Sequence, residues 1–217
     1  MIIESCCTTP GEALSAQARG ADRIELCTDL SVGGVTPSRE LIRETVSRIA
    51  LPVHVLVRDA ACLDFVYDDE AVRRMTDEIA FCRTAGAAGV VVGALTSDGR
   101  IDEAVMQRLV AAAKDGPERP LSVTFHRAFD VGRDDPFEAL RRMAALGCDR
   151  LLTSGRAETA WDGRDLIAAL VRFSAENATG SGAPLVTVMP GRGVRPDNLA
   201  SLQSVTRAEE FHGTALP

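Results

Sequence analysis

A short sequence signature recurs along the chain, each time where an expected helix ends and a strand begins. It reads Gly20-Ala21-Asp22-Arg23-Ile24, Gly86-Ala87-Ala88-Gly89-Val90 and Gly147-Cys148-Asp149-Arg150-Leu151, with a weaker copy at Arg207-Ala208-Glu209-Glu210-Phe211. The strands between these copies begin with proline, at Pro52, Pro120 and Pro184. Glycine suits the left-handed residue after a helix, and proline suits the first residue of a strand. Fourfold repetition of a two-strand, two-helix unit favours a closed (β/α)8 barrel over an open sheet.

The hydrophobic pattern between these signatures alternates between strand and helix. Strands are expected at residues 2–5, 23–27, 52–57, 90–92, 121–125, 150–153, 185–188 and 210–212. Helices are expected at residues 9–19, 36–48, 68–85, 102–114, 136–146, 165–176 and 197–202. Strict alternation requires parallel strands joined by helical crossovers. We therefore predict one α/β domain over residues 1–217, a short (β/α)8 TIM barrel that lacks an eighth helix.

The composition argues against several functional classes. The formal net charge of −7 disfavours nucleic acid or an anionic membrane as the main partner. The N-terminus lacks the pattern of a signal peptide, and no apolar run is long enough to span a bilayer. We expect a cytoplasmic protein whose six cysteines are free thiols. None of them forms a C-x-x-C pair, which argues against a zinc knuckle.

Two cysteines follow strand glutamates with the same spacing. Cys6 comes two residues after Glu4 and Cys27 two residues after Glu25, so each pair lies on one side of its strand. Neighbouring strands lie about 4.8 Å apart, and level ends would bring the thiolates together at a separation suited to Cu(I). Cys7 is the adjacent alternative ligand. The other interpretation is that these cysteines are simply small buried residues.

A second cluster follows the expected strand at 121–125. His126, Arg127 and Asp130 lie in the loop before the next helix, where barrels handle ligands. They are candidates for substrate binding or acid–base catalysis, and Glu25 and Glu4 are further acid–base candidates. Alternatively, the three residues form an ion-pair cluster that fixes the loop, and Glu25 and Glu4 are counter-ions to Arg58 and Arg127.

Further substrate-binding candidates lie at other strand ends. Arg58 and Ser154 follow the third and sixth strands, and His212 lies on the eighth. Arg192 lies between Gly191 and Gly193 after the seventh strand, where barrels often bind phosphate through backbone N–H groups. The alternative for this Gly-x-Gly segment is a plain tight turn.

Several segments resemble the CutC copper homeostasis family over essentially the whole chain. They are residues 20–27, 33–38, 93–99, Phe125-His126-Arg127-Ala128-Phe129-Asp130, Leu152-Thr153-Ser154-Gly155, Met189-Pro190-Gly191 and Glu210-Phe211-His212. The resemblance implies a cytoplasmic (β/α)8 barrel, a homo-oligomer (dimer or tetramer), that handles copper. The family's proposed Cu(I)-ligand cysteines match Cys6 and Cys27.

The chain also departs from the family pattern. Residues 58–65 replace the segment Arg-Pro-Arg-Gly-Gly-Asp-Phe, so the second arginine and both glycines are absent. Arg192 replaces a glycine, and the usual C-terminal extension is missing, which affects oligomerisation through that region. We expect the altered segment to change the mouth of the barrel and any anion site there.

Two functions remain open at this point. The first is a binding protein that holds copper(I) through Cys6 and Cys27 without turnover. The second is an enzyme that acts on a small anionic substrate at the mouth of the barrel. The absence of a ligand-sized cavity at the mouth would count against the enzyme.

Overall fold

Eight strands alternate with helices along the computed structural model, which describes residues 1–116, 119–178, 182–214 and 216. The strands are β1 (Ile2–Cys7), β2 (Arg23–Leu26), β3 (Val53–Leu56), β4 (Gly89–Val92), β5 (Ser122–Phe125), β6 (Arg150–Thr153), β7 (Thr187–Pro190) and β8 (Glu210–Gly213). The helices are α1 (Pro10–Arg19), η1 (Leu30–Val32), α2 (Arg39–Arg48), α3 (Asp69–Thr84), α4 (Glu103–Lys114), α5 (Ala128–Val131), α6 (Pro136–Leu146), α7 (Arg164–Glu176) and α8 (Pro196–Thr206).

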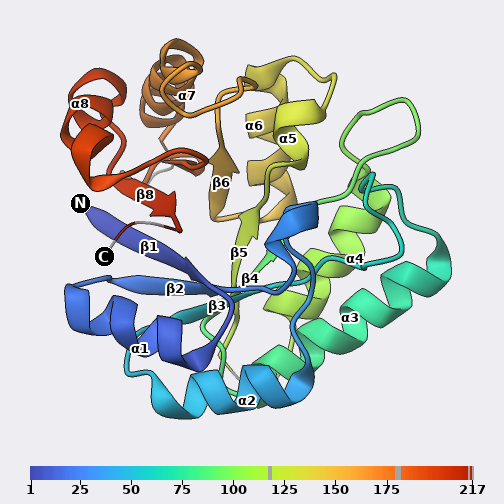
Figure 1. Cartoon of the computed structure of the whole chain (residues 1–217). Coiled ribbons are helices and arrows are strands. Elements are labelled where there is room, and N and C mark those ends of the chain that lie inside the picture. The colour runs from blue at the N-terminus through green and yellow to red at the C-terminus, as the bar shows by residue number, and fades with distance from the viewer. Residues whose placement is uncertain (117–118, 179–181, 215, 217) are drawn as a thin grey trace.

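The strands form one parallel sheet that nearly closes into a barrel. Its order is β7-β6-β5-β4-β3-β2-β1-β8, and the two end strands, β7 and β8, are neighbours in space. The helices surround the strands, which confirms the predicted (β/α)8 barrel (Figure 1). Among the described residues no helix follows β8, and the outside of β1 and β8 lies between α8 and α1 (Figure 1).

The recurring signature closes helices and ties strands together. Gly20, Gly86 and Gly147 follow their helices with φ angles of 98°, 87° and 91°, the left-handed region that glycine adopts without strain. The aspartates of two copies accept backbone hydrogen bonds from the preceding strand: Asp22 from Ile3 at 2.8 Å and Asp149 from Val123 at 2.7 Å. These carboxylates fix the start of one strand against the next.

Several boundaries differ from the prediction, and the structure adds a helix. Strand β7 begins at Thr187 instead of 185, because the Val186 N–H and C=O both bond to the Ser174 hydroxyl of α7. Helix α2 begins at Arg39, since the Thr36 hydroxyl is engaged with the backbone of residue 58. The short helix α5 was not predicted, and it lies inside the loop after β5.

The two faces of the barrel strands differ in character. The face toward the helices is apolar and forms the main core, with Leu26, Val55, Val90 and Phe125 fully buried. The barrel interior instead holds buried charged and polar side chains: Glu4, Arg23, Glu25, His54, Glu210 and His212. A barrel interior of this composition is stable only where its charges are paired.

Candidate functional site

A cavity of about 520 Å³ opens where the strands end on the C-terminal side of the barrel. This volume lies within the range of small-molecule sites. Its floor and walls include Cys6, Glu25, Cys27, Leu56, Val91, His126, Leu152 and His212, and its rim includes Leu30, Val32, Arg58, Phe65, Arg127, Val131, Arg192 and Arg195. The mouth therefore brings together eight of the ten predicted site residues.

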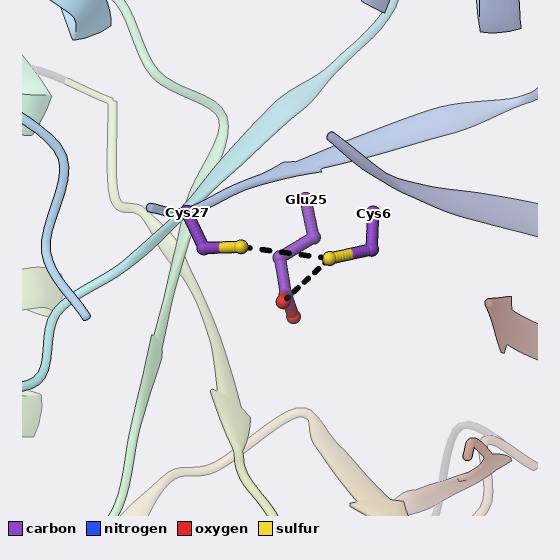
Figure 2. Close-up of side chains that lie close together, drawn as sticks. All are labelled: Cys6, Glu25 and Cys27. Carbon is purple, nitrogen blue, oxygen red and sulfur yellow. Dashed lines mark hydrogen bonds between the residues drawn. The ribbon is translucent and has the colours of Figure 1, made fainter. Parts of the chain in front are cut away.

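The floor of the cavity holds the two cysteines beside a glutamate. The Sγ atoms of Cys6 and Cys27 lie 3.5 Å apart, and Glu25 Oε1 lies 3.8 Å from Cys6 Sγ. Figure 2 shows these three side chains pointing toward one another. All three are buried, and their ligand atoms lie within 4.8 Å of one another. Two soft sulfur atoms with an adjacent carboxylate form a donor set that suits a soft metal ion.

The strand register explains this geometry. Cys6 pairs with Glu25 across β1 and β2, and the Cys27 N–H donates to the Cys7 carbonyl at 3.1 Å. The strand ends are thus level, as the prediction required. Leu56 and Val91 pack against the two thiols from β3 and β4. The hydrogen bond to Cys27, burial and the nearby charge of Glu25 all raise the pKa of the Cys6 thiol.

A continuous network of ion pairs runs below the cysteines. Glu4 contacts His212 at 2.8 Å and accepts a hydrogen bond from Arg23. Arg23 also reaches Glu210 at 2.6 Å, and Arg150 binds the same Glu210 oxygen at 2.7 Å. The counter-ions of Glu4 are therefore Arg23 and His212, rather than the arginines of the mouth.

Glu4 and Glu25 have pKa values shifted in opposite directions. Burial opposes ionisation of Glu4, but the His212 hydrogen bond and the Arg23 charge hold the Glu4 pKa well below its usual range. Burial raises the pKa of Glu25 to about 6. Burial disfavours charge on His212, yet Glu25 and Glu4 raise the His212 pKa to about 9. At neutral pH the cysteine pair therefore lies beside a protonated histidine.

The three histidines each lie against a glycine of the barrel interior. A Cβ atom at Gly89 would lie 2.7 Å from the His54 ring, and one at Gly93 would lie 2.5 Å from His126 Nδ1. A Cβ at Gly191 would lie 3.3 Å from His212 Cδ2. Only glycine leaves room for these rings without displacement.

His126 lies in the wall of the cavity and packs against the loop that follows β3. Its ring centroid lies 4.9 Å from that of Phe65, and the Arg58 guanidinium lies 4.5 Å from the Phe65 ring centroid. Arg58 donates to the carbonyls of Val32, Gly34 and Leu63 and so connects the loops after β2 and β3. Burial, with the charge of Arg58, lowers the pKa of His126 to about 3.

Asp130 and Ser154 connect two loops beside the cavity. Asp130 pairs with Arg127 at 3.0 Å and accepts hydrogen bonds from the Ser154 N–H and hydroxyl, both at 3.0 Å. It also accepts bonds from the Thr153 hydroxyl and the Arg156 N–H. Among the described residues that line the cavity, Arg127 is present and Asp130 and Ser154 are not. The contacts of Arg127 and Asp130 fit an ion pair that holds this loop, whereas His126 forms no ion pair among the described residues.

Arg192 lies at the rim in an unusual backbone conformation. Its φ angle is 71°, in the left-handed region, and its side chain is exposed. Neither Arg192 nor Arg195 forms an ion pair with another described residue. These two positive charges are therefore available to an anion at the mouth.

Phe65 and Gly93 had no predicted site role, and Gly191 was predicted only as part of the Gly-x-Gly segment around Arg192. Phe65 lies in the segment that departs from the family pattern, and its φ of 67° is a marked exception for a bulky residue. Sequence offers no signal for such a conformation. The sequence carries a weak signal for the two glycines. Gly93 follows β4 and Gly191 follows β7, and the next strand in each case ends near a histidine, His126 or His212.

The lowered pKa values of two buried histidines, His54 and His126, predict that the protein loses stability in mild acid. Folded His54 and His126 have pKa values near 4 and 3, so both take up protons on unfolding below pH 6.5. Folded Glu25, with a pKa of about 6, and folded His212, with a pKa of about 9, hold protons and offset part of this effect. The net expectation is a loss of about 2 kcal/mol of unfolding free energy between pH 6.5 and 5. Urea unfolding at both pH values measures it, and an equal or higher stability at pH 5 contradicts it.

Known proteins resemble this chain over nearly its whole length. The CutC family model matches residues 1–216. The family protein CutC of Parabacteroides distasonis is 42% identical over 215 residues, covering 99% of this chain and 82% of that protein. That of Histophilus somni is 39% identical over 215 residues, with 99% and 82% covered. A structure assigned as the copper homeostasis protein CutC of Streptococcus agalactiae covers 100% of both chains, with 28% identity and a TM-score of 0.85.

Fold and site together define a (β/α)8 barrel with a thiol- and arginine-lined cavity at the C-terminal mouth. The chain belongs to the CutC family. In the described part of the chain, no helix is long and apolar enough to cross a membrane.

Proposed function

We propose that this protein binds one Cu(I) ion between Cys6 and Cys27 and serves copper homeostasis in the cytoplasm. The observation that carries the proposal is the 3.5 Å separation of the two buried Sγ atoms at the cavity floor. The two sulfur atoms would hold the ion as soft thiolate ligands, at a separation that two ligands of one metal ion can span. Both thiols would have to lose their protons, and the protonated His212 would offset the charge of the two thiolates.

The test is an anaerobic titration of the reduced protein with Cu(I) against a chromophoric chelator. The expected result is one tightly bound copper ion per chain. Copper that remains entirely with the chelator would remove the basis for the proposal. The proposal also includes a homo-oligomer, a dimer or tetramer, which light scattering coupled to size-exclusion chromatography measures.

A second candidate function is an enzyme that acts on a small anionic substrate. The cavity of about 520 Å³ favours it, since two thiolates alone require much less space. Glu25, with its pKa of about 6, is the acid–base candidate, and Arg127 and Arg192 supply positive charge. A screen of small phosphorylated and carboxylated compounds for turnover tests this candidate.

A further inference from the structure

We propose that the His126 side of the cavity is a binding subsite for a small organic oxyanion, with a ligand oxygen accepting a hydrogen bond from His126 Nε2–H. The inference goes beyond copper, because His126 is not among the candidate copper ligands. It shares with the second candidate function only the expectation that the ligand is anionic. It adds that His126 is the residue that binds that ligand.

The hydrogen bonds of His126 fix where its proton lies. The Ala128 N–H donates to His126 Nδ1 at 3.2 Å, so Nδ1 is the unprotonated nitrogen. The ring is neutral at physiological pH, since burial lowers its pKa. The remaining proton is on Nε2, which is buried without a hydrogen-bond partner among the described residues. A buried donor left unpaired costs about 1–3 kcal/mol, and an acceptor in the cavity removes that cost.

An aromatic residue with a strained backbone conformation packs against this histidine. Phe65 packs on the His126 ring with its backbone at φ 67°, and the Leu95 N–H fixes the Phe65 carbonyl at 2.8 Å. A non-glycine residue in this conformation costs on the order of 1–3 kcal/mol, and such strain concentrates at ligand sites. The absence of a side chain at Gly93 gives the ring its space.

The charge of the lining specifies the class of ligand. Among the described lining residues, four arginines face one carboxylate: Arg58, Arg127, Arg192 and Arg195 against Glu25. Two of these arginines, Arg192 and Arg195, lack an ion-pair partner in the described chain. Arginine forms its strongest hydrogen bonds with carboxylate and phosphate groups. Either group presents the acceptor oxygen that His126 needs.

The experiment is calorimetric titration of the copper-free, full-length protein with pyruvate, glycerol 3-phosphate and inorganic phosphate. Saturable binding of at least one probe is expected. In His126→Asn, the amide oxygen can still accept from the Ala128 N–H, as in an Asx turn, while the Nε2 donor is removed. We expect this variant to weaken binding about tenfold or more. Arg43→Ala, an exposed substitution on α2, is the control, with binding unchanged.

The probes distinguish the possible ligand classes. Binding of pyruvate alone assigns a carboxylate, binding of glycerol 3-phosphate alone assigns a phosphate ester, and either result supports the subsite if His126→Asn weakens it. No binding of any probe up to about 10 mM, or equal binding by wild type and His126→Asn, overturns the inference. Binding without any turnover rejects the enzyme and leaves the subsite in place.

Discussion

Replacing both Cys6 and Cys27 by serine is expected to abolish tight Cu(I) binding, with the affinity falling at least about 1000-fold. The reason is chemical: serine supplies a hard, neutral hydroxyl where Cu(I) requires a soft thiolate. Cys6 and Cys27 are the two thiols of the cavity floor, and their Sγ atoms lie 3.5 Å apart. Anaerobic competition with a chromophoric chelator measures the affinity of the wild type and of the double variant.

Cys7→Ser is the matched control for this prediction. Cys7 is the next residue on β1 and is equally buried, but its side chain packs in the main core with its Sγ 3.7 Å from the Ser5 carbonyl. We expect its copper affinity to equal that of the wild type. If the double variant retained stoichiometric copper while Cys7→Ser lost it, the ligand assignment would be wrong. If neither variant changed the affinity, copper would bind elsewhere on the chain.

The barrel could be predicted because its repeat is local. Three copies of the signature place a left-handed glycine after a helix, and the carboxylates of Asp22 and Asp149 accept backbone hydrogen bonds that join adjacent strands. The closeness of Cys6 and Cys27 followed from the same regularity, since neighbouring parallel strands with level ends bring equivalent positions together. Both inferences needed only spacing along the chain and the geometry of a parallel sheet.

The partners of buried charges could not be predicted, because they lie across the barrel. Arg23, Arg150 and Glu210 occupy equivalent positions of the repeat, yet they come from β2, β6 and β8 and meet at one carboxylate. Their pairing depends on the closure of the sheet. Sequence alone left Glu25 as a possible counter-ion of Arg58, whereas the structure places Arg58 against backbone carbonyls.

The buried network connects the stability of the barrel to its site. Arg23 holds Glu4, Glu4 binds His212 at 2.8 Å, and His212 lies 3.9 Å from Glu25 beside the cysteines. Each charge is compensated by the next, so the position of the His212 ring at the cavity wall depends on Arg23 at the other end of the network. The hydrogen bond from His212 and the charge of Arg23 together hold the pKa of Glu4 below its usual range.

Replacing Arg23 by methionine is expected to lower the free energy of unfolding by about 3–5 kcal/mol, because it leaves Glu4 and Glu210 with one buried charge partner fewer. Methionine keeps the apolar stem, so the effect isolates the guanidinium. Urea unfolding at pH 7.5 measures it. Arg19→Met, an exposed change on α1, should alter stability by less than about 0.5 kcal/mol. Arg23→Met with Glu4→Gln should recover part of the loss, because the Glu4 carboxylate that lost its arginine partner becomes a neutral amide. Equal stability of Arg23→Met and Arg19→Met would show that the interior tolerates unpaired carboxylates, against the geometry of this network.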